Sequence, residues 1–513
     1  MVREEIIKLI EKATGEKPEK IKVEHPENAS HGDYSTNIAL QLKKDPEKIV
    51  KKLKSDALER IEVAKPGFIN FFISKEYLQR QVEDILRQKE KFGQLIKKKR
   101  EKANIELVSA NPTGPLHIGN GRNVFAGDVI ANVFKKAGYQ ITREYFINDA
   151  KNSGQIKELG KTALGKGTAY LTPYLKEKTR TKKKELKKFN KEEEAGYWLA
   201  QEIQKDIKIF LENKLKIKFD KWVSEENDIY RQNKVKKIFE WLQKKGLIYE
   251  KDGARWLKTS KYGTERDWAV VRESGKPTYL LSDIAYHKYK FDRGFNKVVD
   301  IWGADHQAHA SKIKAAAKML NFRGDLDVLI LQLVSLKGKE RLSKRKGEII
   351  TLEDLVNEIG LDTARFFYLQ KSLNTHMEID IALAKQQSEK NPVYYIQYAH
   401  ARICSIFKKI KNKELRIKTF EPSLLNHQSE LTLIKKMIRL PEIVEDTAKD
   451  YQTQRLPQYS IELATAFHQF YRDCRVISVN KKLTQSRLSL ALATKTVLKN
   501  TLDLMGITAP EEM

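Results

Sequence analysis

Residues 105–122, IELVSANPTGPLHIGNGR, decide the fold of this chain. A short apolar run comes first and predicts a strand at about 105–109. A turn rich in Pro and Gly follows, and a helix is expected over 123–138. In an open α/β sheet, the turn between a strand and the next helix lies at the carboxyl edge, where ligands bind. The stretch therefore predicts a ligand site at the edge of a mostly parallel sheet.

The same alternation of strands and helices continues from about 104 to 370. Further strands are expected at 297–302 and 328–334, and a helix at 308–320. This order predicts an α/β domain with helices on both faces of a parallel sheet. A long, charged helical stretch at 172–214 interrupts the pattern and predicts an insertion, bounded at about 155–240. Its lysines are open to two interpretations, contact with RNA or a solvated helix face.

Two flanking domains are expected. Residues 1–95 begin with an amphipathic helix, continue with strand-like alternation around Pro66-Gly67 at 61–74, and end in a helix at 77–93, which predicts an α+β domain. From 386 to 513 the pattern is almost continuously helical and predicts an all-α bundle. The α/β domain then spans 96–385.

Composition narrows the class of partner. The chain has 513 residues and a formal net charge of +29. Such a charge favours polyanions, although a lysine-rich solvated surface is the alternative. Two cysteines without metal-ligand spacing argue against structural zinc and disulfides, and no metal site formed by side chains is expected. Neither a signal peptide nor a membrane span is seen, so a cytoplasmic protein is expected.

His117 and the glycines beside it predict a phosphate site. N–H groups at a helix N-terminus bind phosphate, and Gly114 and Gly119 let the backbone approach a ligand closely. His117 can donate a hydrogen bond to a phosphate oxygen. A single histidine in a turn is also common as a purely structural residue, and that alternative stays open from this motif alone.

A second cationic segment lies far along the chain, GKERLSKRKGEIITLEDL at 338–355. Glycines bracket a loop that carries Ser343, Lys344 and several other cations. Such a loop suits the neutralisation of a triphosphate, and a basic surface loop is the alternative.

Together these segments resemble the arginyl-tRNA synthetases, a family of class I aminoacyl-tRNA synthetases. SANPTGPLHIGNGR resembles the first signature of the class, and RLSKRKG resembles its KMSKS loop. REYFINDA, PTYLLSDIAYH, IWGADHQAH, NPVYYIQYAHARICSI and the terminal GITAPEEM resemble the arginyl family, and HGDYSTNIALQL resembles its amino-terminal domain. The resemblance covers nearly the whole chain.

The resemblance implies that arginine and ATP form arginyl-adenylate, and that the arginyl group then passes to the 2′-hydroxyl of the terminal adenosine of tRNA(Arg). It implies catalytic roles for His117, Asn120 and Lys344, with Mg²⁺ accompanying ATP and a monomer expected. The implied ATP-binding residues are Pro115, His117, Gly119, Asn120, Gly303, Asp305, Ser343 and Lys344.

The resemblance also implies an arginine pocket made of Glu106, Ser109, Asn111, Tyr279, Asp283 and His306. Two acids, Glu106 and Asp283, suit a guanidinium with five rigid donors. The alternative for Asp283 is a cap for a helix that begins near Ile284. For Tyr279 the alternative is core packing.

The implied tRNA contacts are Tyr398, His400, Arg402 and Arg475 in the anticodon-binding bundle. Aromatic and arginine side chains suit stacked single-stranded bases, although tyrosines at helical spacing are often core residues. The family's amino-terminal domain reads the tRNA elbow, without contact residues that can be named here.

Two departures from the family pattern leave alternatives open. Asn120 stands where arginyl enzymes usually have a second histidine, and Arg341-Leu342 replaces Lys-Met. A nucleotidylyltransferase with the same H-x-G motif is one alternative, but it does not account for the bundle or the acid pair. An RNA-binding paralogue that does not activate arginine is the other.

Overall fold

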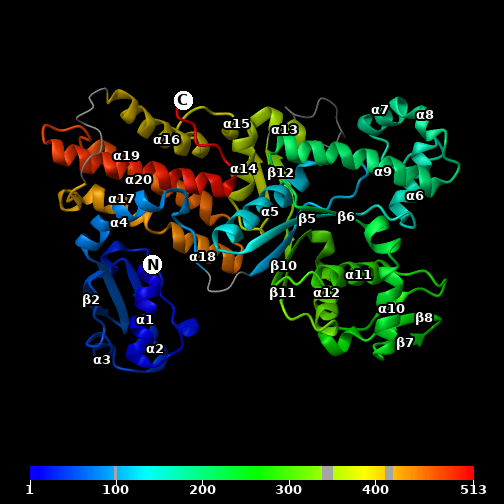
Figure 1. Cartoon of the computed structure of the whole chain (residues 1–513), viewed down its shortest axis with the longest axis horizontal. Coiled ribbons are helices and arrows are strands. Elements are labelled where there is room, and N and C mark those ends of the chain that lie inside the picture. Colours follow the sequence, from blue (N-terminus) through cyan, green and yellow to red (C-terminus); the bar gives the residue numbers. More distant parts are fainter. Residues whose placement is uncertain (97–100, 338–349, 411–419) are drawn as a thin grey trace.

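The computed structural model describes residues 1–96, 101–337, 350–410 and 420–513. At its centre is a five-stranded sheet in which every neighbouring pair is parallel, in the order β11-β10-β4-β5-β6 (Figure 1). The strands are β4 (Lys102–Glu106), β5 (Gln140–Ile147), β6 (Lys221–Ser224), β10 (Lys297–Gly303) and β11 (Asp325–Leu331). The predicted parallel sheet is confirmed.

The strand and helix around the opening stretch both lie earlier than predicted. β4 ends at Glu106 because Val108 and Ser109 have φ values of 70° and 39°, which leave the extended region. Helix α5 (Ile118–Lys136) starts directly after its N-cap, His117. The motif therefore stands at the first turn of α5 and at the carboxyl edge of the sheet.

Two further helices flank strand β10 in the chain. Helix α11 (Tyr279–Phe291) precedes β10, and α12 (Gln307–Met319) follows it. The predicted helix at 308–320 and the strand at 297–302 are confirmed.

The predicted insertion at 155–240 needs correction. Helices α6 (Gly154–Ala163), α7 (Pro173–Thr181), α8 (Lys183–Leu186) and α9 (Glu192–Ile209) do form a helical unit after β5. The chain then returns to the main sheet, because β6 pairs with β5 in parallel from Lys221 to Ser224. The helical insertion therefore ends before β6.

A second insertion, which the sequence analysis did not foresee, separates β6 from α11. It contains α10 (Lys234–Lys244) and an antiparallel sheet of β7 (Ile248–Lys251), β8 (Ala254–Leu257) and β9 (Trp268–Val271). Its strands are only four residues long, so their alternation is a weak signal in sequence.

The segment after the main sheet links it to the bundle. Strands β12 (Val334–Lys337) and β13 (Met377–Asp380) pair in parallel. Helices α13 (Leu352–Ile359) and α14 (Leu361–Leu369) lie between them, and α15 (Ile381–Ala384) follows.

The amino-terminal domain is α+β, as predicted. Its antiparallel sheet has the order β1-β3-β2, and the expected strands at 61–74 form the β2–β3 hairpin. Its elements are α1 (Val2–Thr14), β1 (Tyr34–Thr36), α2 (Ile38–Leu42), α3 (Pro46–Val50), β2 (Leu58–Ala64), β3 (Phe68–Ile73) and α4 (Lys75–Gln88).

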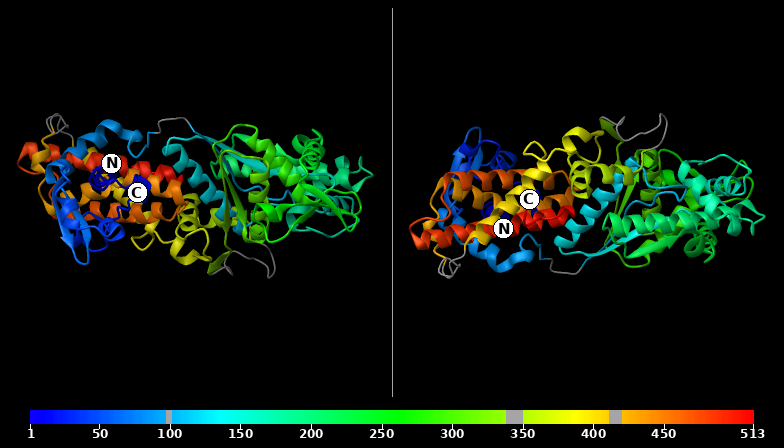
Figure 2. Two further views of the ribbon diagram at one scale, coloured as in Figure 1. Left: turned by 90° about the horizontal axis from the view of Figure 1, so that it is seen from below. Right: turned by 90° about the horizontal axis from the view of Figure 1, so that it is seen from above.

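The carboxyl-terminal part is a helical bundle, which confirms the third predicted unit. Its helices are α16 (Pro392–Lys409), α17 (Gln428–Met437), α18 (Leu440–Asp450), α19 (Arg455–Asp473) and α20 (Lys481–Met505). The amino-terminal domain packs on this bundle: the Tyr34 hydroxyl donates to Glu442 at 2.8 Å, and Arg3 donates to Asp446 at 2.9 Å. The amino-terminal domain and the bundle thus share one half of an elongated molecule, and the catalytic domain forms the other (Figure 2).

Candidate active site

The turn after β4 is strained and tightly held. A β-branched residue such as Val108 rarely adopts a positive φ. Its N–H donates to Asn123 Oδ1 at 2.8 Å, and Asn123 Nδ2 donates to the Ile301 carbonyl at 2.7 Å. Ser109 Oγ accepts from the Phe146 N–H at 3.0 Å. The Asn123 side chain of α5 and the backbone of β5 therefore hold this turn, as expected of a ligand site.

His117 is held as a neutral hydrogen-bond donor. Its Nδ1 accepts from the Gly119 N–H at 3.0 Å, so the ring proton of the neutral imidazole must lie on Nε2. Partial burial lowers the pKa of His117, which favours this neutral form. Pro115, His117 and Gly119 are exposed, so Nε2–H is accessible to a phosphate oxygen.

Asn120 completes the cap of α5. Its Oδ1 accepts from the His117 backbone N–H at 2.9 Å. This orientation leaves the two Nδ2 hydrogens of Asn120 to donate elsewhere. The residue in place of the second histidine thus caps the helix and still offers a donor.

The downstream end of the second cationic segment lies beside His117. The Ile118 N–H donates to the Ile350 carbonyl at 3.2 Å, and the Leu352 N–H donates to the Leu116 carbonyl at 2.8 Å. Ser343 and Lys344 themselves lie outside the described residues. The residues that directly follow the second cationic loop therefore contact the His117 motif, which lies more than two hundred residues earlier in the chain.

Four carboxylates act on the hydroxyl of Tyr279. They belong to Asp283, Glu225, Glu106 and Asp305, and with burial they raise the pKa of Tyr279 well above its ordinary value. Glu106, Glu225 and Asp283 are buried, whereas the Tyr279 side chain is half exposed. We call this group of four acids around Tyr279 the acid pocket. An accessible tyrosine among several carboxylates is suited to a ligand that carries positive charge.

Glu225 was missed by the sequence analysis. It follows β6 directly and is 5% exposed. Burial and the nearby charge of Asp283 raise its pKa to about 8. A buried acid whose pKa is raised by a neighbouring carboxylate is a functional candidate. Its sequence context, SEEND, is typical of a charged surface, and only the return of the chain to the sheet at β6 buries it.

Asp283 is no helix cap, because α11 begins at Tyr279 with Thr278 as its N-cap. Asp283 therefore lies inside the helix, buried, and the capping alternative is wrong. Its Oδ2 accepts from His309 Nε2 at 2.6 Å. The same histidine ring lies 5.3 Å from the ring of Tyr279, so α12 closes one side of the acid pocket.

One carboxylate oxygen of Glu106 is occupied by contacts within the protein. Its Oε2 accepts from the Tyr286 hydroxyl at 3.0 Å and is ion-paired with Lys290. Both of these described contacts use Oε2, which leaves Oε1 as the atom that can face a ligand.

The other predicted residues lie around the same edge. Asn111 is exposed in the turn before α5. Gly303 ends β10, and Asp305 and His306 follow it, with 3.5 Å between Asp305 Oδ2 and His306 Nε2. A Cβ on Gly303 would lie 2.7 Å from Asp305 Oδ1, so glycine permits this tight turn.

The bundle presents a ring-rich surface on α16 and α19. The rings of Tyr394 and Tyr398 stack at 6.3 Å, and Arg402 donates to the Tyr398 hydroxyl at 2.6 Å. The Arg402 guanidinium also lies 4.4 Å from the centre of the Tyr471 ring. Arg475 is exposed just beyond α19.

His400 does not belong to this surface. It is 1% exposed, and its Nδ1 lies 2.7 Å from the carbonyl oxygen of Pro510. Two residues along a helix point to opposite faces, so His400 faces the core while Tyr398 and Arg402 face outward. The predicted RNA contact of His400 is therefore wrong.

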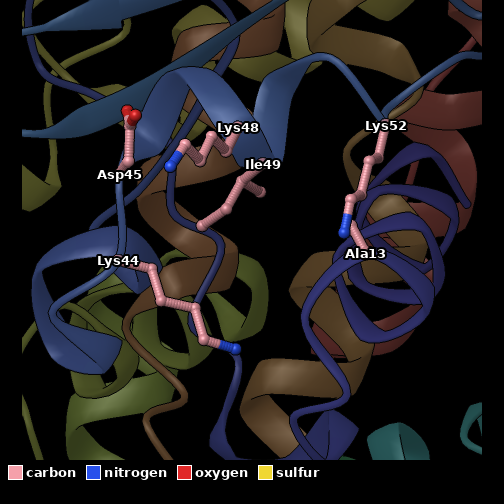
Figure 3. A pocket seen from close by; sticks show the side chains of 6 residues that line it. All are labelled: Ala13, Lys44, Asp45, Lys48, Ile49 and Lys52. Atoms are coloured by element: carbon pink, nitrogen blue, oxygen red, sulfur yellow. The ribbon is translucent and has the colours of Figure 1, made fainter.

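A cavity of about 340 Å³ lies on the amino-terminal domain, far from the acid pocket. Lys44, Lys48 and Lys52 line it together with Asp45 (Figure 3). Lys44 Nζ donates to the Thr14 carbonyl at 3.1 Å.

The described residues lack both a side-chain cluster for a metal ion and a membrane-spanning helix. Among them, no group of three or more His, Cys, Asp or Glu side chains is arranged to hold a metal ion. In the same part of the chain, every helix is too short or too polar to span a membrane.

Comparison with known protein families assigns all three units. Residues 1–73 match the arginyl-tRNA synthetase N-terminal domain, 156–388 the catalytic domain of class I (R) tRNA synthetases, and 396–513 the DALR anticodon binding domain. The fold and the site thus define a class I aminoacyl-tRNA synthetase.

Individual relatives identify the family within this class of synthetases. The chain is 39% identical to the arginine–tRNA ligase of Carboxydothermus hydrogenoformans and 41% identical to that of Dehalococcoides mccartyi, in each case over 96% of this chain and 94% of the relative. It has the fold of the Thermus thermophilus arginyl-tRNA synthetase, with a TM-score of 0.83, 20% identity and all of both chains covered. The chain belongs to the arginine–tRNA ligase family, and its activity is that of an aminoacyl-tRNA ligase. The nucleotidylyltransferase alternative is wrong.

Proposed function

We propose that this chain joins arginine to tRNA(Arg) in two steps at the carboxyl edge of the five-stranded sheet. In the first step, a carboxylate oxygen of arginine attacks the α-phosphorus of ATP, which forms arginyl-adenylate and releases pyrophosphate. In the second step, the 2′-hydroxyl of the terminal adenosine of the tRNA attacks the arginyl carbonyl carbon, and AMP leaves. No side chain needs to act as a nucleophile, so the protein contributes positioning and electrostatic stabilisation.

The acid pocket is the observation that carries this proposal. Arginine brings two positive charges, the guanidinium and the α-ammonium. Asp283 and Glu225 are the proposed guanidinium partners, since they are buried and act on each other electrostatically. Glu106 Oε1 and Asn111 are then left for the α-ammonium, next to Ser109 and His306. Lysine would leave one of the two buried guanidinium partners unpaired, which costs several kcal/mol.

The first turn of α5 is the proposed binding site for the ATP phosphates. His117 Nε2–H and Asn120 Nδ2–H donate to phosphate oxygens, with Pro115 and Gly119 beside them. Gly303 and Asp305 are the proposed contacts of the adenosine. Ser343 and Lys344 are the proposed contacts of the β- and γ-phosphates. Mg²⁺ would accompany ATP and be held chiefly by the phosphates and by water.

Gly119→Ala is expected to lower kcat for adenylate formation about 100-fold. A Cβ at this position would lie 2.8 Å from His117 Cε1 and 2.9 Å from Nδ1, so the imidazole must move. Loss of one transition-state donor costs about 2.7–4 kcal/mol. Arginine-dependent ATP–pyrophosphate exchange with tRNA present measures the effect. Gly154→Ala at the start of α6 is the matched control, because this glycine is not among the proposed phosphate contacts and the added Cβ meets nothing within 4 Å. Equal activity of the two variants would contradict the role of His117.

The ring-rich surface of the bundle is the proposed site for the anticodon bases, through Tyr398, Arg402 and Arg475. Bases stack on rings and on guanidinium planes, and Arg402 already lies over Tyr471. The lysine-lined cavity of the amino-terminal domain is a second proposed contact, with the RNA backbone at the tRNA elbow.

Tyr398→Ala is expected to raise the KM for tRNA about 5- to 100-fold, because one stacked base is worth roughly 1–3 kcal/mol. The KM values for arginine and ATP should not change, since the residue lies in the bundle. Steady-state aminoacylation at varied tRNA concentration measures both. A changed arginine KM with an unchanged tRNA KM would instead place Tyr398 outside the RNA contact.

Aminoacylation of total tRNA with each labelled amino acid in turn tests the proposed function. Arginine alone should be incorporated, and an excess of unlabelled lysine should not compete. Incorporation of another amino acid, or of none, would overturn the proposal.

A further inference from the structure

Three carboxylates lie side by side in one row across the sheet. Glu106 on β4 is in register with Glu144 on β5 and with Asp300 on β10. All three are buried, at 4%, 0% and 0% exposure. Like charges on neighbouring strands destabilise a sheet, so this row requires compensating cations. We call these three residues the carboxylate row.

Lys290 of α11 compensates two members of the row at once. Its side chain has no exposed surface, and Nζ lies 2.6 Å from Asp300 Oδ1. The same ammonium is ion-paired with Glu106 Oε2. One lysine thus bridges two strands of the sheet and the helix that covers them.

The remaining charges of α11 and of the turn after it complete the balance. Arg293 donates to both oxygens of Glu144, at 2.6 and 2.9 Å. His287 Nε2 lies 2.8 Å from Asp300 Oδ2. Burial alone would lower the pKa of His287, but the charge of Asp300 raises it above its ordinary value. Three cations therefore face three carboxylates.

The face of α11 that meets this row continues into the acid pocket. Asp283 precedes Lys290 by seven residues, or two helical turns, and Tyr279 lies one further turn away. The contacts of Lys290 that hold α11 at one position and rotation on the sheet therefore also determine the position of Asp283.

Stability alone is a weak reason for this arrangement. Buried ion pairs contribute little compared with apolar residues of the same volume, because desolvation offsets the attraction between the charges. Their geometry, by contrast, is specific, since each oxygen accepts from a defined donor.

We propose that Lys290 is a positioning residue for the amino acid substrate. Its two ion pairs fix α11 on the carboxylate row, and the helix then presents Asp283 and Tyr279 to the acid pocket at the spacing that arginine requires. This inference rests on the proposed function. Displacements of about 1 Å at a reacting site cost up to 100-fold in rate.

The test uses a pair of variants of the full-length chain. Lys290→Met leaves the buried Glu106 without its cation and removes one of the two partners of Asp300, so this variant can fail to fold. The double variant Lys290→Met with Asp300→Asn removes one charge of each sign, so the net charge of the row is kept, although Glu106 loses its ion pair. In this double variant we expect a folded protein whose KM for arginine is raised about 10- to 100-fold, with unchanged KM values for ATP and tRNA.

Lys288→Met is the matched control. Lys288 lies on the same helix but is partly exposed and pairs with Asp292 at 2.5 Å, so its arginine KM should equal that of the wild type. A wild-type arginine KM in the double variant would overturn the inference, as would equal increases in the KM values of arginine and ATP. If the wild type itself failed to charge tRNA with arginine, the proposed function would fail first.

Discussion

Asp283→Asn is expected to raise the KM for arginine by about two to three orders of magnitude, with little change in the KM for ATP. Asp283 is 5% exposed and lies inside α11, where the capping role is excluded. Removing one partner of a buried charge pair costs about 3–5 kcal/mol, because the other charge is left unpaired. Asparagine keeps the volume and can still contact His309, so the loss reports on charge rather than on packing.

ATP–pyrophosphate exchange at varied arginine and ATP separates the two KM values. Asp292→Asn is the control, since this side chain stands at the end of the same helix and is 60% exposed. It should behave as the wild type. Equal increases in the arginine and ATP KM values for Asp283→Asn would show that the substitution disturbs the site as a whole.

The second large effect is a pH dependence of arginine affinity that originates in Glu225. Its pKa is raised to about 8 in the free protein, so at pH 7 the carboxyl mostly holds a proton. Arginine requires the ionised form, and binding must therefore release that proton. Affinity should fall about tenfold for each pH unit below 8, and it should level off above 8.

Calorimetric titration with arginine between pH 6 and 8.5, in two buffers of different ionisation enthalpy, counts the protons released. Close to one proton should be released at pH 7 by the wild type. In Glu225→Gln the affinity should be weak and the slope should disappear, although the side chains of His309 and Asp149 also face this region. An unchanged slope in Glu225→Gln would assign the pH dependence to one of those groups.

Short sequence motifs predicted those parts of the site that are formed by a few consecutive residues. The order of strand, Pro/Gly turn and helix around His117 and Gly119 indicated a phosphate site, although the helix was expected at 123–138 and begins earlier, with His117 as N-cap of α5. The sequence did not show why residue 119 is glycine: in the structure, a Cβ at this position would lie 2.8 Å from Cε1 of the His117 ring. The missing second histidine is a smaller departure than the sequence indicates, because Asn120 both caps the helix and keeps a donor.

The sequence did not predict the features that depend on which residues of neighbouring strands are paired. Glu106, Glu144 and Asp300 are separated by dozens of residues, and only the pairing of β4 with β5 and β10 brings them into one row. Glu225 is buried for the same reason, since β6 returns to the sheet just before it.

His400 shows the opposite case, in which a signal was present and was not used. Tyr394, Tyr398 and Arg402 are spaced by four residues and share one helix face. His400 falls between them on the other face, which the structure buries under Pro510. Helical spacing alone would have separated the surface residues from the core residue.

A crystal structure of the protein with arginine and tRNA tests the central claim most directly. The guanidinium nitrogens should lie about 2.7–3.1 Å from carboxylate oxygens of both Asp283 and Glu225, with the α-ammonium toward Glu106 and the carboxylate toward His117. An arginine whose guanidinium points away from Asp283 and Glu225, or that binds outside the acid pocket, would contradict this account.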